Sequence, residues 1–240
     1  IYTLQRKTKM ATSNSKNFEP DVAEYIEEAF ERCGLELRTG YDLKTANRSL
    51  NIMLAEWANR GLNQWTIAKK TVDMVASTST YNVDTVNSTA PIDVLDVFVR
   101  ETSGTEVTDI SMTRLSRAEY SNIVTKSSEG RPNQFFIDKQ ISPTISVWPT
   151  PDLSDKYTIH MNVLTRIDDA DAATNTMEVP FRFYPCLAAG LAYYISMKKA
   201  PQLTGQLKSI YDEEFNRAMS ADEDRASFRV APNLRNYNSA

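Results

Sequence analysis

Side chains that could perform acid–base chemistry gather in one acidic segment near the start of the chain. Glu24, Glu27, Glu28 and Glu31 fall within eight residues of each other. Two carboxylates can act as the acid and the nucleophile of a glycoside hydrolase when an apolar pocket raises the pKa of one of them. The surrounding sequence supplies no such pocket. We therefore interpret these glutamates as one helix face that meets solvent or a partner.

Metal, nucleophilic and phosphate chemistry have little support in the sequence. His160 is the single histidine, and one histidine without a cysteine cluster cannot build an ordinary zinc site or a Ser-His-Asp triad. Asp168, Asp169 and Asp171 lack the glycine and the final glutamate of an EF-hand loop, so they indicate a solvated linker. The seven glycines form neither phosphate-binding motif. We predict no catalytic residue, no metal and no cofactor.

Aromatic residues offer recognition instead of catalysis. Phe135, Phe136, Trp148 and Tyr157 could form a platform on which a sugar or a base stacks. No arginine or lysine is interleaved with them in the pattern of a nucleic-acid site, which favours packing within a β domain or against a tail component.

The last segment, residues 225–240, carries three arginines and no acid. Arginine and aromatic side chains dominate binding hot spots. This segment is therefore either a docking peptide or an ordinary terminal extension, and the sequence supports the two interpretations equally. The residues that would form the docking peptide are Arg225, Phe228, Arg229, Arg235 and Tyr237.

The composition is that of an ordinary globular protein. With 240 residues, 41% hydrophobic content and a net charge of −4, the chain can bury a core and does not indicate a nucleic-acid or membrane partner. Cys33 and Cys186 lie far apart and fit free structural thiols of a protein made in a reducing cytoplasm. No apolar run approaches the roughly 20 residues that a membrane span needs.

Four segments have the three- and four-residue apolar spacing of amphipathic helices. The first follows Pro20 and ends near Gly34, and the second covers residues 43–60 with Asp42 as its N-cap. The third contains the stripe Phe183, Leu187, Leu191 and Ile195 and a set of small residues that allow close helix approach. The fourth covers residues 202–221, with Pro201 at its start.

Between the two helix pairs the sequence changes to the alternating pattern of β-strands. Glycine and proline residues enclose the runs 133–138 and 143–148 and predict a hairpin. Residues 157–166 predict a third strand beside it, in a meander. Two further strands about a turn near residues 77–80, a hairpin at Ser103-Gly104 and a short helix capped by Ser116 with Glu119 complete the expected elements.

These elements predict an α+β fold. Two N-terminal and two C-terminal helices form a four-helix platform, and an antiparallel β domain is inserted between the pairs. The expected boundaries are 1–17 for a flexible N-terminal arm, 18–64 and 176–224 for the platform, 65–175 for the β domain and 225–240 for an extended C-terminal tail.

Several motifs then point to a family. They are LNIMLAEWANRGLNQW in the second helix, EGRPNQFFIDKQ and ISVWPTPD in the hairpin, YTIHMNVL in the next strand, and VPFRFYPCLAAGLAYYIS in the third helix. In this order they resemble the head-to-tail adaptor proteins of short-tailed bacteriophages, the group that includes tail tubular protein A and related head-completion proteins. The similarity covers about residues 18–237.

The resemblance implies a structural virion protein and no enzyme. It implies a dodecameric ring in the neck of the phage, between the portal and the tail nozzle or tail tube protein, through which double-stranded DNA passes during genome ejection without specific binding. In such adaptors the C-terminal segment reaches the portal, which suits residues 225–240. The acids Glu24–Glu31 would face the lumen and repel phosphate. No membrane is involved, and synthesis takes place in the host cytoplasm.

Two other classes of protein stay open from the residues alone. A carbohydrate-binding adhesin module would use Trp148 and Tyr157 as its stacking surface. A cell-wall hydrolase of a phage tail would use the glutamates.

Overall fold

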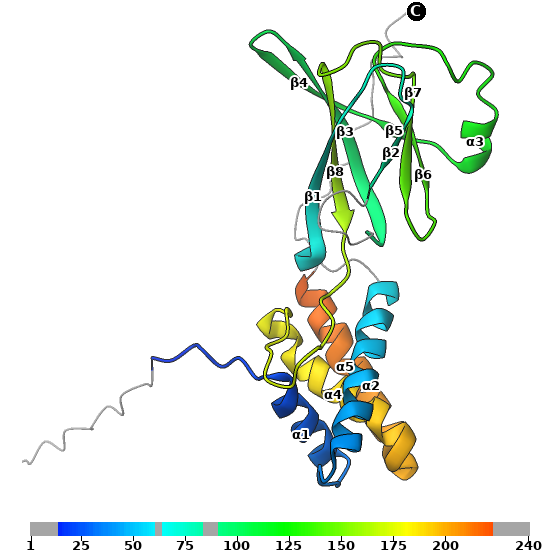
Figure 1. The fold of residues 1–240 in the computed structure, drawn as a ribbon. Helices are drawn as coiled ribbons and strands as arrows, with labels where there is room; N and C mark the ends of the chain where they lie inside the picture. The colour runs from blue at the N-terminus through cyan, green and yellow to red at the C-terminus, as the bar shows by residue number, and fades with distance from the viewer. Residues whose placement is uncertain (1–13, 61–63, 84–90, 223–240) are drawn as a thin grey trace, which may run out of the picture.

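The chain folds into a helical platform with a β domain at one end of it (Figure 1). The structure is a computed structural model and describes residues 14–60, 64–83 and 91–222. The platform consists of α1 (Val22–Arg32), α2 (Gly40–Arg60), α4 (Tyr184–Lys199) and α5 (Thr204–Asp222). The predicted α+β fold, with two helix pairs packed together around a β insert, is confirmed.

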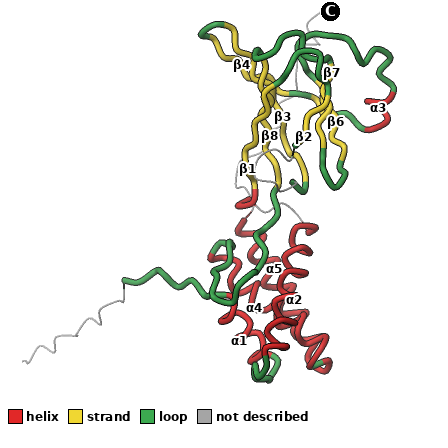
Figure 2. Tube along the Cα trace, in the orientation of Figure 1, coloured by secondary structure: helices red, strands yellow, loops and turns green. Residues whose placement is uncertain are grey.

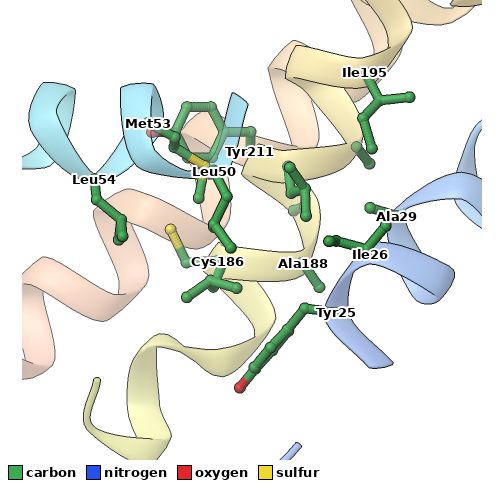
Figure 3. Packing of buried hydrophobic residues seen from close by; sticks show 14 of the residues in the cluster. Tyr25, Ile26, Ala29, Leu50, Met53, Leu54, Cys186, Ala188, Ile195 and Tyr211 are labelled. Atoms are coloured by element: carbon green, nitrogen blue, oxygen red, sulfur yellow. The ribbon is translucent and has the colours of Figure 1, made fainter. Parts of the chain in front are cut away.

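Helix α4 forms the centre of the platform and packs against α1, α2 and α5. It is apolar on nearly all sides, which is typical of a fully enclosed helix. Its small residues let the neighbouring helices approach closely, as predicted. A Cβ atom built on Gly190 would lie 2.7 Å from Cε2 of Tyr211 and would also collide with Sδ of Met53. Figure 3 shows how side chains from these helices interlock around α4.

The ends of the helices follow the capping rules, with one correction. Asp21 caps α1, and its carboxylate accepts the amide of Glu24 while the Glu24 carboxylate accepts the amide of Asp21. The predicted cap of α2, Asp42, is wrong. The helix begins at Gly40, and Oγ1 of Thr39 accepts the Asp42 amide at 3.2 Å. The Asp42 carboxylate is instead paired with Lys199 at the end of α4.

The β domain contains two sheets of four strands that enclose a second core (Figure 2). One sheet has the order β1-β8-β3-β4 and the other β2-β7-β6-β5. The strands are β1 (Ile67–Asp73), β2 (Thr80–Asn82), β3 (Asp93–Ser103), β4 (Glu106–Ser111), β5 (Thr113–Arg114), β6 (Gln134–Asp138), β7 (Thr144–Trp148) and β8 (Tyr157–Leu164). Pairing is antiparallel except between β5 and β6, which run parallel.

Both predicted hairpins are confirmed. β6 pairs with β7 in the register Phe136↔Ser146, and β3 pairs with β4 through a turn in which Gly104 adopts a φ of 62°. The short helix α3 (Arg117–Ser121) carries the predicted capping box of Ser116 and Glu119.

The predicted meander is wrong, because β8 does not continue the sheet of β6 and β7. It pairs with β1 and β3 in the opposite sheet. The turn near residues 77–80 likewise joins β1 to a strand of the other sheet. Every second residue of β8, from Tyr157 to Val163, is buried in the core between the sheets. Alternation therefore fixed which side of the strand is buried but not its partner.

The platform and the β domain are joined by two connections that lie side by side. The first runs through the 3-10 helix Gln64–Thr66 into β1. The second connection leaves β8. Its residue Thr165 is bonded to the first connection, since the Thr165 amide and hydroxyl both donate to the Thr66 carbonyl, at 2.9 and 2.7 Å. The last residue of α5, Asp222, accepts the Gln64 amide at 3.0 Å and is paired with Arg182. This set of contacts closes the junction.

Two further sequence expectations concern the cysteines and the membrane. Cys33 and Cys186 are free and buried in the platform core, as predicted. Among the described residues, no helix is both long enough and apolar enough to cross a bilayer.

Candidate interaction surfaces

A groove runs between the first turns of α1 and the start of α4. We call it the aromatic groove, and its volume is about 510 Å³. Two aromatic side chains beside it are largely exposed, Phe18 at 68% and Phe181 at 72%. Its lining residues are Phe18, Pro20, Glu24, Tyr25, Glu28, Arg32, Phe181, Tyr184, Pro185 and Ala188.

The floor of the aromatic groove is a chain of ring contacts. Tyr184 meets Phe181 edge-on, with ring centroids 5.4 Å apart, and meets Tyr25 edge-on at 5.9 Å. The Tyr25 hydroxyl is buried and has no hydrogen-bond partner among the described residues. Burial raises the pKa of Tyr25, with smaller contributions from Tyr184 and Glu24. A buried hydroxyl without a partner costs stability, so an incoming donor or acceptor would be favoured at this position.

The four predicted acids of α1 are all exposed, and the helix divides them into two rows. Glu24 and Glu28 are four residues apart and line the aromatic groove. Glu28 pairs with Arg32 at 2.7 Å. Glu27 and Glu31 form the second row, and within the described residues neither takes part in an ion pair. The acids therefore belong to two surfaces, and the sequence analysis treated them as one.

Helix α2 presents an exposed stripe that the sequence analysis did not single out. We call it the α2 stripe, and it consists of Tyr41, Lys44, Arg48, Ile52 and Ala55. Spacings of three and four residues place these side chains along one side of the helix. Tyr41 and Ile52 are 75% and 51% exposed, so the α2 stripe carries one large apolar side chain near each of its ends. Lys44 and Arg48 lie between them.

A shallow hollow of about 540 Å³ follows the α2 stripe and is bordered by Arg166 and Asp169. Here the connection from β8 is fixed to α2. The Asn51 side chain accepts the Ala170 amide at 2.7 Å and donates to the Ala170 carbonyl at 3.1 Å. The segment predicted as a solvated linker is therefore held against the platform. The sequence did contain a signal for the positive charge of the α2 stripe, because Lys44 and Arg48 are four residues apart in the predicted helix.

The aromatic residues proposed as a stacking platform in the β domain differ in how deeply they are buried. Phe135 and Tyr157 are buried in the core between the sheets. A buried ring cannot stack on a ligand from solvent, so the sugar-platform alternative loses two of its four residues. Phe136 is half-buried and stacks on Tyr120, with ring centroids 5.2 Å apart. Trp148 is half-buried, and its Nε1 donates to the Thr125 carbonyl at 3.0 Å. This contact attaches the loop after α3 to the end of β7.

Exposed apolar residues gather at the end of the β domain that is remote from the platform. Val75 and Leu153 lie on the loops β1–β2 and β7–β8, and Val107 lies near the tip of the β3–β4 hairpin (Figure 1). The two loops are joined by the Ala76 amide, which donates to Ser154 Oγ at 3.0 Å. We call this end the distal tip.

The residues considered for acid–base and metal chemistry do not assemble into a site. His160 is half-buried and stacks on Phe98 with ring centroids 5.0 Å apart. Burial raises the pKa of Glu178, and Asp168 adds to this shift. In the described part of the chain, no three His, Cys, Asp or Glu side chains are placed to hold a metal ion. The tail residues Arg225 to Tyr237 lie outside the described residues.

Exposed apolar side chains lie on the platform and on the distal tip, and grouped side chains of this kind mark surfaces that bind partners. The chain matches the SU10 adaptor protein model over residues 20–235 and belongs to that family. It is therefore a phage head-to-tail adaptor, a structural rather than catalytic protein that binds other virion proteins. The resemblance found in the motifs is confirmed. No match was found among curated proteins.

Proposed function

We propose that twelve copies of this chain close into a ring. The ring joins the portal to the tail nozzle or tail tube protein and lines the passage for DNA. The observation that supports this most directly is the presence of two separate hydrophobic cores, one in the platform and one in the β domain. A connector must meet different neighbours at its two ends, and separately stabilised ends suit that task.

The mass of the assembly tests the ring. Native mass spectrometry of the purified chain, alone and with the portal of the same phage, should give a closed species whose mass is a fixed multiple of the chain, twelve in this proposal. A chain that stays monomeric under both conditions would contradict the ring. A closed species of another size would correct only the stoichiometry.

The exposed acids of α1 are proposed to face the lumen. Like charges repel, so glutamates on the wall of the passage would keep DNA phosphates from adhering. Of the four, Glu27 and Glu31 suit this role best, because the other two line the aromatic groove. The variant Glu27→Gln with Glu31→Gln should form rings but retain DNA, so that genome ejection slows. Unchanged ejection kinetics would remove the lumen assignment.

The C-terminal tail is proposed to dock on the portal. Deletion of residues 227–240 should abolish portal binding while leaving the circular dichroism and the thermal unfolding of the chain unchanged. A matched variant, in which Arg229 and Arg235 become lysine, retains the charge but loses the planar guanidinium, and it should bind with intermediate strength. Full portal binding by the deletion variant would exclude this tail from the interface.

The distal tip is proposed to meet the next tail component. Val75 and Leu153 are exposed apolar side chains on adjoining loops, and apolar anchors of this kind contribute strongly once a partner excludes water. Replacing both with serine should weaken binding of the nozzle or tail tube protein and leave portal binding intact. Equal loss of both partners would point to misfolding instead, which thermal unfolding would reveal.

A further inference from the structure

A ring built head-to-tail needs two different faces on every subunit, and these faces must fit each other. The aromatic groove and the α2 stripe share no residue, and both lie on the platform. We infer that the α2 stripe of one subunit docks in the aromatic groove of a second copy. This inference rests on the proposed ring and specifies the contact that closes it.

The charges of the two faces are complementary and equally spaced. Lys44 and Arg48 are four residues apart on α2, and Glu24 and Glu28 are four residues apart on α1. Four residues of helix correspond to a rise of about 6 Å, so both pairs have the same separation. Two helices laid side by side therefore bring each base within reach of one acid, and the base opposite Glu28 competes there with Arg32 of the same groove. Such pairs fix orientation and exclude incorrect partners.

The apolar groups of the two faces also match. The aromatic groove offers Phe18, Phe181 and Tyr184 as its exposed floor and walls. The α2 stripe offers Tyr41 at one end and Ile52 at the other, with the bases between them. A helix that inserts apolar anchors into a groove, with charges at the rim, is a recurring mode of protein recognition. Without a partner, four large apolar side chains on these two faces stay exposed to solvent, namely Phe18, Tyr41, Ile52 and Phe181.

The Tyr25 hydroxyl supplies an independent observation. It is buried, it belongs to the lining of the aromatic groove, and it has no hydrogen-bond partner within the described residues. In Figure 3 the hydroxyl end of Tyr25 points away from the packed cluster of the platform. Docking that moves the covering side chains aside would let a lysine or arginine from the α2 stripe of a second copy donate to this oxygen. Docking would thus satisfy a polar atom that has no partner among the described residues.

Charge reversal tests the contact in both directions. The variant Lys44→Glu with Arg48→Glu should lose the ring, because acid then meets acid. The variant Glu24→Lys with Glu28→Lys should lose it as well, since base meets base. The Asp21 carboxylate can still accept the amide of residue 24, whereas the bond from the Asp21 amide to the Glu24 carboxylate is lost. An equal mixture of the two variants should restore a ring of wild-type mass with alternating subunits, because both kinds of contact are then attractive.

A matched control separates this contact from a general effect of charge. Lys69→Glu with Lys208→Glu changes the net charge by the same amount as Lys44→Glu with Arg48→Glu, but at exposed positions of β1 and α5. This control should form rings like the wild type. Native mass spectrometry gives the assembly state of every sample, and circular dichroism verifies that each variant is folded.

A cross-link provides a second readout that leaves every charge in place. Ile52→Cys chains mixed with Phe181→Cys chains should give a cross-linked dimer with a short bismaleimide, whereas either chain alone should not. The natural thiols stay silent, because Cys33 and Cys186 are buried. This pair decides the matter if a reversed variant fails to fold.

The outcomes distinguish this inference from the ring itself. If the wild type and both reversal variants form rings and the cysteine pair gives no cross-link, the contact is overturned and the proposed ring stands. Wild-type chains that remain monomeric, alone and with portal, would overturn both. Loss of the ring in each variant, rescue on mixing and the cross-link in the mixed sample together support the contact.

Discussion

Gly190 occupies the place where α4 passes closest to α2 and α5. A methyl group there would collide with Met53 and with the Tyr211 ring. The thioether of Met53 can move aside, but the ring is held in place, because its hydroxyl accepts from Nε1 of Trp57 at 2.8 Å. The absence of a side chain at this position therefore sets the distance between three helices.

We expect Gly190→Ala to destabilise the platform. Overpacking costs roughly 1–3 kcal/mol, and the better helix propensity of alanine returns about 1 kcal/mol at most. The net loss should appear as a lower midpoint of urea unfolding. Gly205→Ala is the matched control, since a Cβ at Gly205 meets no atom within 4 Å. If the two variants unfold alike, the close approach at Gly190 has no energetic weight.

We expect His160 to make the stability of the β domain depend on pH. Burial lowers its pKa, and Arg100 lowers it further, against the opposing influence of Asp109 and Asp73. The folded pKa thus lies below the ordinary value of 6.5, so the unfolded chain binds the proton more readily. Stability from this group is complete above pH 6.5 and is lost as the pH falls through the folded pKa.

The variant His160→Phe should remove this dependence while keeping the stack on Phe98. We expect unfolding midpoints of the wild type to fall between about pH 7 and 5, and those of the variant to change less. The chain contains a single histidine, so the comparison needs no correction for others. Parallel pH curves for the two proteins would show that His160 titrates as in the unfolded chain.

At the scale of elements, Asp222 holds the end of α5 to the junction. Its side chain is 2% exposed, it is paired with Arg182, and it accepts the Gln64 amide. Asp222→Ala would leave a backbone donor and a guanidinium without their acceptor, which costs roughly 1.5–3 kcal/mol. Urea unfolding should show this loss, and limited proteolysis should reveal faster cleavage near Gln64.

The control for Asp222 is an exposed carboxylate on the same helix. Asp212 lies 3.6 Å from Arg60, and exposed pairs contribute about 1 kcal/mol or less. Asp212→Ala should therefore change stability little. A result in which the two alanine variants lose the same stability would contradict the special role of the junction.

Local signals in the sequence predicted most elements correctly. Periodicity located the four platform helices, and turn residues located both hairpins, because these patterns depend on neighbouring residues. The partner of β8 could not be predicted, since its pairing with β1 joins residues about 90 positions apart, and alternation carries no information on partners. Asp42 was misassigned as a cap because its partner, Lys199, lies 157 positions away in the sequence.

The candidate surfaces were predicted less completely than the fold. The acids of α1 were identified by composition, but their division into two rows follows from the packing of α1 on α4. The unpartnered hydroxyl of Tyr25 has no signature in the sequence, because its burial depends on Tyr184 and its neighbours. Exposure of Tyr41 and Ile52 likewise became evident only once the apolar stripe of α2 was oriented.

At the scale of the whole molecule, two cores should unfold separately. Ile145 is fully buried in the β core and Leu187 in the platform core. Truncating either to alanine removes buried contacts worth roughly 2–5 kcal/mol. We expect Leu187→Ala to lower the transition followed by the helical circular dichroism signal, and Ile145→Ala to leave that transition nearly unchanged. A single transition shifted equally by both variants would show one cooperative unit.

The pairing of β1 with β8 has a mechanical consequence. Both strands connect to the platform at the same end of the sheet, where Ile67 faces Leu164. A pull between the platform and the distal tip therefore runs along the strands, and the backbones of β1 and β8 carry it in parallel. A ladder loaded in this direction does not peel open one hydrogen bond at a time. With the β domain facing the tail, as proposed, the two strands would transmit tension from the tail towards the head.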